Sequence, residues 1–166
     1  ATSYLQRLTA TSPNDFNVLL ESGKCHLVSG RYEAAEAAFK TAVAMNPRSW
    51  EAETVLATTY DLMERPDEAV LHHNIAMDLA PSNPTVLSNG ALSRALAGDL
   101  TDALSLMRKA AAQPKASARV RMNLAFLEAL AGHGDVAAMM ARQEANGDEA
   151  SVKLLQRIAA THREKA

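Results

Sequence analysis

The sequence predicts an all-α chain in which a pair of helices is repeated. Composition is the first observation, because the 166 residues include 33 alanines and 20 leucines but only nine valines and two isoleucines. Alanine and leucine favour helices and β-branched residues favour strands, which argues against a large sheet. Spacing is the second observation. A period of 34 residues relates three prolines and five alanines, which are Pro13, Pro47 and Pro81, and Ala1, Ala35, Ala69, Ala103 and Ala137.

A third observation is that small and bulky residues recur in the same register. If the alanine series is numbered position 20 of each unit, small residues stand at positions 8 and 27 and bulkier ones at position 24. These are Gly23, Ala57, Ala91 and Ala125 at position 8, Ala42, Ala76 and Ala110 at position 27, and Phe39, His73 and Met107 at position 24. Small side chains let two helices approach closely, so we expect positions 8, 20 and 27 at the contact within each pair.

This 34-residue pattern resembles the tetratricopeptide repeat. The resemblance implies four repeats, at 16–49, 50–83, 84–117 and 118–151, each folding as two antiparallel helices. Proline at position 32 then ends the second helix and turns the chain. Several residues depart from the pattern. Glu53 and Arg121 occupy position 4, where the family has a large apolar residue, Ser22 replaces the leucine of position 7, and the second helix of the fourth repeat has Ala141 at position 24 and Glu144 at position 27.

The register continues beyond the four repeats at both ends. Residues 1–15 carry the pattern of a second helix, so we expect the chain to begin within a repeat whose first helix is missing. Residues 152–166 carry the pattern of a first helix with a polar outer side, as a capping helix requires, and Asp148 is its expected N-cap. The expected fold is one superhelical domain over 1–166, with about ten antiparallel helices.

Charge and cysteine content exclude some classes of function and structure. The chain has 17 basic and 19 acidic residues, so it is not a polycationic nucleic-acid binder. Between residues 14 and 78 there are eleven acids and five bases, whereas residues 103–127 hold five bases and no acid. This asymmetry fits either an ordinary solvated surface or a partner with an acidic end. The lone Cys25 excludes an intramolecular disulfide, and we interpret it as a structural cysteine.

The resemblance also places a binding surface. In this family, positions 2, 5, 6, 9, 12 and 13 of the first helices face a concave groove. The residues that we assign to the partner-binding groove are Leu20, Glu21, Lys24, Thr54, Val55, Thr58, Ser88, Asn89, Leu92, Arg119, Met122, Asn123 and Phe126. The Lys, Arg and Asn pattern that clamps a C-terminal carboxylate in chaperone-binding relatives is absent, which disfavours an adaptor for chaperone tails.

Two asparagines stand out in that groove. Asn89 and Asn123 both occupy position 6, 34 residues apart, so stacked repeats would place their amides in a row. An amide offers one acceptor and two donors, which suits the backbone of a bound peptide. The alternative is that asparagine is simply common at this position.

A narrower resemblance covers Val86 to Asp135, on the stretches VLSN, ALAGDL, RKAAAQP and above all ARVRMNLA. This part is similar to the TadD family of the tight-adherence (Flp) pilus system. The resemblance implies an outer-membrane lipoprotein that faces the periplasm and acts as a pilotin-like assembly factor for the pilus secretin. Its lipid would be attached to an N-terminal cysteine that precedes this chain, since Cys25 lies within a predicted helix.

Catalytic motifs are missing from the sequence. It contains no G-x-S-x-G, phosphate-binding loop or H-E-x-x-H, and the adjacent His72 and His73 would point about 100° apart on a helix, too far to share an ion. We therefore expect no enzyme, cofactor, metal site or nucleic-acid partner, and membrane contact only through the lipid. The expected function is protein binding in pilus assembly. A generic adaptor that binds an extended peptide in another assembly stays open, as does a regulatory domain of an enzyme.

Overall fold

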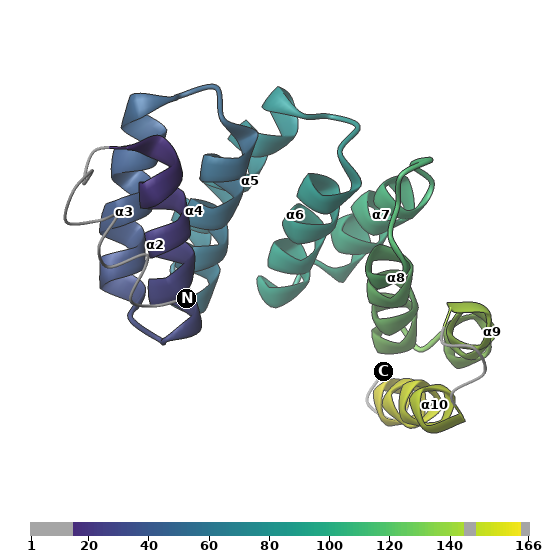
Figure 1. Cartoon of the computed structure of the whole chain (residues 1–166). Coiled ribbons are helices and arrows are strands. Elements are labelled where there is room, and N and C mark those ends of the chain that lie inside the picture. Colours follow the sequence, from purple (N-terminus) through teal and green to yellow (C-terminus); the bar gives the residue numbers. More distant parts are fainter. Residues whose placement is uncertain (1–14, 145–148, 164–166) are drawn as a thin grey trace. The chain divides into compact units, whose positions relative to one another are not determined.

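The computed structural model describes residues 15–144 and 149–163, and all regular structure in these ranges is helical. Nine helices are present in the described ranges (Figure 1). They are α2 (Phe16–Val28), α3 (Tyr32–Met45), α4 (Trp50–Leu62), α5 (Pro66–Leu79), α6 (Pro84–Leu96), α7 (Leu100–Ala111), α8 (Ala118–Leu130), α9 (Gly134–Glu144) and α10 (Glu149–Arg163). The predicted all-α fold is confirmed. The helix expected within residues 1–15 and the cap Asp148 lie outside the described residues, except for Asp15.

The helices form two compact units, residues 1–81 and 82–166. In the N-terminal unit, α2 packs on α3, α3 on α4 and α4 on α5. In the C-terminal unit, α6 to α10 pack in the same consecutive way. First helices of neighbouring pairs also contact each other, α2 with α4 in one unit, and α6 with α8 and α8 with α10 in the other. Each unit therefore presents a surface made of first helices.

The starts of the first helices recur every 34 residues, at Phe16, Trp50, Pro84 and Ala118. The residue before each start accepts hydrogen bonds from the first-turn amides; these caps are Asp15, Ser49, Asn83 and Ser117. Asp15 Oδ1, for example, accepts from the backbone N–H of Asn17 at 2.9 Å and of Val18 at 3.0 Å. These side chains satisfy amide donors that lack partners within the helix, and so fix where each helix begins.

The ends of the first helices share a left-handed residue. Gly30, Gly98 and Gly132 have φ of 70°, 89° and 82°, and Glu64 takes the equivalent place with φ of 56°. The following amide then bonds back to a carbonyl five residues earlier, as Arg65 N–H does to Tyr60 C=O at 3.0 Å. Glycine adopts this conformation without the Cβ clash that Glu64 must accept.

The core confirms the predicted contact positions. The alanines at positions 20 and 27 of the first three repeats are completely buried, and so are Phe39, His73 and Met107 at position 24. Gly23 shows why position 8 must be small, because a Cβ built there would lie 2.4 Å from a ring carbon of Phe39. The small residues at positions 8, 20 and 27 therefore mark the places where paired helices approach each other most closely.

The two charged residues at position 4 are accommodated by partners on the neighbouring second helix. Glu53 is 3% exposed, and its Oε2 lies 2.6 Å from Nδ1 of His72 on α5. Arg121 pairs with Glu144 on α9 and donates to the Ala116 carbonyl at 2.7 Å. In both cases a hydrogen bond to a charged side chain replaces the apolar contact that the family has at this position.

Two details differ from expectation. Cys25 is exposed on α2 and therefore is not a structural cysteine, because only one side of that helix faces its neighbours. The last helix begins at Glu149, the residue after the expected N-cap Asp148, although the repeat register placed the capping segment only from 152 onward.

Candidate functional site: the first-helix surfaces

The first-helix surface of the N-terminal unit satisfies its own charges. Lys24 on α2 lies 2.8 Å from Glu21 Oε1 and 2.9 Å from Glu51 Oε1 on α4. The carboxylate of Glu21, and with it that of Glu51, raises the pKa of Lys24, so this lysine stays protonated. One cation thus ties two first helices together.

The other N-terminal residues assigned to the groove offer little to a partner. Leu20 is 3% exposed and Thr54 is 5% exposed, so both belong to the interior. Val55 and Thr58 are half-buried. The Thr58 hydroxyl donates to the Thr54 carbonyl at 2.9 Å, which leaves no unused donor on it. Of the six predicted residues here, only Glu21 is exposed.

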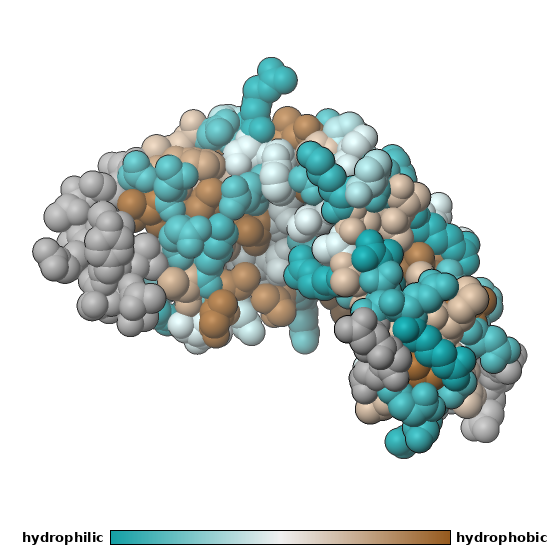
Figure 2. Space-filling view, turned by 45° about the vertical axis from the view of Figure 1, so that its right-hand side comes forward, coloured by the Kyte–Doolittle hydropathy of each residue, from teal (hydrophilic) through white to brown (hydrophobic). Residues whose placement is uncertain are grey.

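The first-helix surface of the C-terminal unit is more open. Ser88 is buried, whereas Asn89, Leu92, Met122 and Asn123 are half-buried, and Arg119 and Phe126 are exposed. The Phe126 ring is large and apolar, and 41% of the residue reaches solvent. On the face drawn in Figure 2, hydrophobic residues appear as small patches between hydrophilic ones. Isolated apolar side chains beside polar groups are typical of partner contacts as well as of ordinary surfaces.

The predicted asparagine row is connected by one hydrogen bond to a neighbouring helix. Asn123 Nδ2 on α8 donates to Ser88 Oγ on α6 at 3.2 Å. This bond uses one of the two donors of that amide and leaves one donor and the acceptor. Ser88 is thus a support for Asn123 rather than a contact surface, because only 2% of it is exposed.

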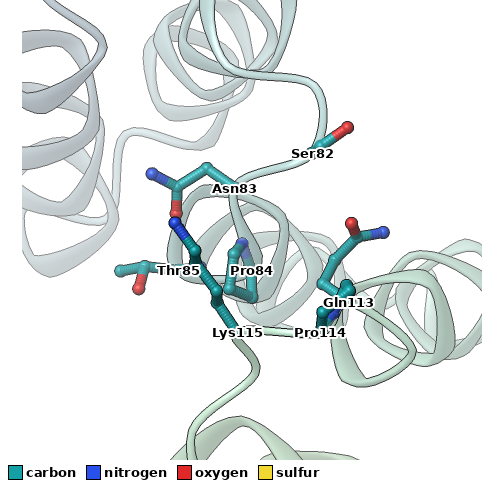
Figure 3. Close-up of a pocket in the computed structure, with 7 residues that line it drawn as sticks. All are labelled: Ser82, Asn83, Pro84, Thr85, Gln113, Pro114 and Lys115. Carbon is teal, nitrogen blue, oxygen red and sulfur yellow. The ribbon is translucent and has the colours of Figure 1, made fainter.

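A pocket of about 580 Å³ lies at the edge where α6 and α8 begin (Figure 3). We call it the turn pocket; it is lined by Ser82, Asn83, Pro84, Thr85, Gln113, Pro114 and Lys115. The turn before α6 covers residues 80–83, whereas the turn before α8 covers 112–117 and is longer. Lys115 is one of the five bases of the acid-free segment 103–127, but the predicted groove does not include it, although Pro114 stands one residue early in the 34-residue series. This displacement of Pro114 by one residue was the signal in the sequence that the turn before α8 differs from the other turns.

The cations near this edge differ in their partners. Arg108 pairs with Glu128 at 2.8 Å, and Arg121 pairs with Glu144. Lys115 and Arg119 are exposed and form no ion pair with any residue that the structure describes. The segment without acids, 103–127, therefore contains both neutralised and unneutralised cations.

The histidines that could suggest a metal have other contacts. His72 approaches Glu53 as described, and His73 Nε2 lies 2.9 Å from Asp61 Oδ2. The two rings thus diverge toward different carboxylates, as their adjacent positions on α5 predict. Within 15–144 and 149–163, no group of three His, Cys, Asp or Glu side chains could hold a metal ion. No described helix is long and apolar enough to cross a membrane.

Solved structures with this fold are similar in shape but distant in sequence. A thermophilic tetratricopeptide-repeat protein of Thermus thermophilus aligns with a TM-score of 0.81 and 21% identity over 95% of this chain and 87% of that one. PilF of Pseudomonas aeruginosa aligns with a TM-score of 0.77 and 19% identity, over 90% and 69% of the two chains. YrrB, described as a TPR protein with an unusual peptide-binding site, aligns with a TM-score of 0.68 and 14% identity, over 96% and 84%.

Family assignment comes from the sequence itself. No curated protein matches the chain. A model of the tetratricopeptide repeat matches residues 1–49 and 20–84, which together make up half of the chain. The same two-helix architecture continues through α6 to α10 in the C-terminal unit. The chain therefore belongs to the tetratricopeptide-repeat family, whose fold is typically a non-enzymatic scaffold for protein–protein interaction.

Proposed function

We propose that this chain is a TadD-like assembly factor of a tight-adherence pilus. In that role it is an outer-membrane lipoprotein on the periplasmic side that holds the pilus secretin while the secretin assembles. The observation that carries the proposal is the TadD-like stretch from Val86 to Asp135. This stretch forms α6, α7 and α8 and enters α9.

The location of the resemblance supports a binding role. The TadD-like stretch contains every residue assigned to the groove in the C-terminal unit, from Ser88 to Phe126. It also contains three exposed cations that form no ion pair with a described residue, Lys109, Lys115 and Arg119. Accessible apolar groups and unneutralised charges are what a protein partner uses for affinity and orientation.

A second candidate is an adaptor that binds an extended peptide in another assembly. The half-buried amides of Asn89 and Asn123 favour it, since they suit a peptide backbone of any sequence. The fold similarity to YrrB, a TPR protein with an unusual peptide-binding site, is consistent with such a role.

Binding to the secretin separates the two candidates. The purified chain is immobilised and exposed to the detergent-solubilised tight-adherence secretin of the same organism, and retention is measured by surface plasmon resonance. We expect saturable binding that Asn89→Ala with Asn123→Ala weakens by about 1–3 kcal/mol, because two hydrogen-bonding groups are lost. Gln143→Ala, an exposed change on α9, is the matched control and should leave the affinity unchanged. Absence of secretin binding would exclude the TadD-like role and leave the adaptor.

The lipoprotein part of the proposal has its own test. Cells that express the natural gene product are fractionated, and the protein is located with an antibody. Recovery in the outer-membrane fraction is the expected result. Recovery in the cytosol would contradict both the location and the pilotin-like role.

A further inference from the structure

We infer that the edge of the C-terminal unit where α6 and α8 begin binds the carboxylates of an acidic peptide segment, whose apolar side chain lies over Leu92 and Phe126. The inference rests on the proposed function, because the ligand is part of a protein partner. It adds the chemistry of the segment that is recognised, and it names Lys115, which the groove prediction did not contain.

The cations at this edge are available. Lys115 lies in the turn before α8 and Arg119 in its first turn; both are exposed, and neither has a carboxylate partner among the described residues. The nearby Arg121 is already neutralised by Glu144, which makes it a poor ligand. The start of a helix also carries a partial positive charge, which adds to the attraction for an anion.

The turn pocket gives the carboxylates a place to bind. Its walls join the starts of two first helices, and Figure 3 shows Lys115 reaching from the turn 112–117 toward the start of α6. The Asn83 side-chain oxygen accepts from the amides of Thr85 and Val86, and Figure 3 draws this oxygen next to the Lys115 nitrogen, with the NH₂ group of Asn83 pointing away. The Lys115 ammonium is the group in this pocket that suits a carboxylate, because it carries a positive charge and offers three donors.

The apolar part of the surface sets the spacing. Phe126 follows Arg119 by seven residues on α8, which is about 10 Å along the helix axis. Leu92 on the adjacent α6 is half-buried and contributes a second apolar group. An extended peptide advances about 3.3 Å per residue, so its carboxylate and its apolar side chain should stand about three residues apart.

The charge of the whole surface selects an acidic ligand. The groove-facing positions of α6 and α8 hold no acidic residue. The corresponding positions of α2 and α4 hold Glu21, Glu51 and Asp61 against the single cation Lys24. A basic segment would therefore be repelled at the C-terminal unit and an acidic one attracted, with an effect that salt weakens.

The test uses the whole chain and three labelled synthetic peptides in fluorescence anisotropy. The first peptide has two glutamates, a spacer of about three residues and then leucine and phenylalanine, between glycine and serine residues. In the second peptide lysines replace the glutamates, and in the third serines replace the apolar pair. We expect the first peptide to bind at least about tenfold more tightly than either of the others, with an affinity that falls as salt is raised from about 50 to about 300 mM.

Charge reversal locates the site. Lys115→Glu with Arg119→Glu should weaken binding of the first peptide at least about tenfold and strengthen binding of the lysine peptide. Arg48→Glu with Lys109→Glu is the matched control, since it makes the same change in net charge at exposed positions outside this edge. It should change the affinity less than about twofold. Circular dichroism verifies that both variants keep their helices.

Several results would overturn the inference. They are equal weakening by both double variants, equal binding of all three peptides, no binding of the first peptide at about 1 mM, or tighter binding of a single-stranded oligonucleotide of equal charge. If the chain binds the secretin but Lys115→Glu with Arg119→Glu does not weaken that binding, the proposed function stands and this inference fails. If the acidic peptide binds as expected but the secretin does not, this inference stands and the proposed function fails.

Discussion

The two units of this chain use the same repeat in different ways. In the N-terminal unit, charged side chains of the first helices form ion pairs with one another, as Lys24 does with Glu21 and Glu51. In the C-terminal unit, Arg119 and Lys115 have no such partner among the described residues, and Phe126 is exposed. The backbone scaffold is shared, so the difference lies in a few side chains at equivalent positions. On the first helices of the N-terminal unit the cation Lys24 is neutralised by two carboxylates, whereas Arg119 on α8 remains exposed without one among the described residues.

Removing the hydrogen-bond partner of a buried carboxylate should have the largest effect on this comparison. Glu53 in the N-terminal unit depends on His72, and its side chain is 4% exposed. His72→Ala would leave that carboxylate buried without its partner and should destabilise the unit by about 3 kcal/mol. Trp50 lies on α4 and is the single tryptophan, so urea unfolding followed by its fluorescence reports on this unit.

The equivalent change in the C-terminal unit is the control. Glu128 contacts His133 at 2.8 Å but also keeps Arg108 at 2.9 Å, and the His133 side chain is 52% exposed. His133→Ala should therefore cost about 0–1 kcal/mol, measured by far-UV circular dichroism. Similar losses for both variants would mean that Glu53 finds another partner and that the two units do not differ in this respect.

Overpacking should have the next largest effect, and it should be the same in both units. Ala69 and Ala103 are completely buried at position 20 of successive repeats. Replacing either by leucine should cost about 1–3 kcal/mol, because the paired helices must move apart. Ala112 is exposed just after α7, and the same change there should cost little. A harmless leucine at Ala69 or Ala103 in thermal unfolding would contradict the shared register.

A smaller effect is expected where the units differ in one turn. Glu64 adopts φ of 56° in the N-terminal unit, whereas Gly98 has φ of 89° at the equivalent place in the C-terminal unit. Glu64→Gly should stabilise the chain by about 0.5–1 kcal/mol, and Gly98→Ala should destabilise it by about 1 kcal/mol. The test is whether the two substitutions change the free energy of unfolding, measured in urea, in opposite directions. Destabilisation by both changes would show that the Glu64 side chain stabilises the turn by more than its strain.

The smallest effect concerns acid. Lys40, and with it Arg65, holds the pKa of Glu36 below its ordinary value, whereas Arg121 alone lowers the pKa of Glu144. A carboxyl group whose pKa is lowered by folding stabilises the folded state at pH values above its ordinary pKa. This stabilisation is lost as the pH falls through the ordinary pKa to the lowered one. Glu36→Gln should therefore flatten the loss of stability between about pH 5 and pH 3 more than Glu144→Gln does. Urea midpoints at several pH values would measure this, and an unchanged slope for Glu36→Gln would refute it.

Much of the fold could be predicted from the sequence because the repeat encodes local geometry. Each residue at position 8, 20 or 27 reports a helix contact within its own repeat, and the glycine series with Glu64 marks where first helices end. The caps Asp15, Ser49, Asn83 and Ser117 were a further signal at the same period, which the sequence reasoning did not use.

The candidate site was less accessible to prediction, because it depends on pairings between helices. The sequence marks Glu53 and Arg121 as departures but does not name His72 or Glu144 as their partners, 19 and 23 residues away. Nor does the register tell which groove positions are covered, and Leu20, Thr54 and Ser88 are buried. The turn pocket arises from two turns of unequal length, which a strict 34-residue period does not describe.

The central claim, that the C-terminal unit keeps its surface for a partner, is tested most directly by nuclear magnetic resonance. The 17.8 kDa chain is titrated with the acidic peptide, and the backbone amide shifts are followed. The account predicts that the largest shifts fall in residues 82–96 and 112–130, on α6, α8 and the turns before them. Shifts concentrated on α2 and α4 would contradict it, because the partner would then bind the unit whose charges are already paired.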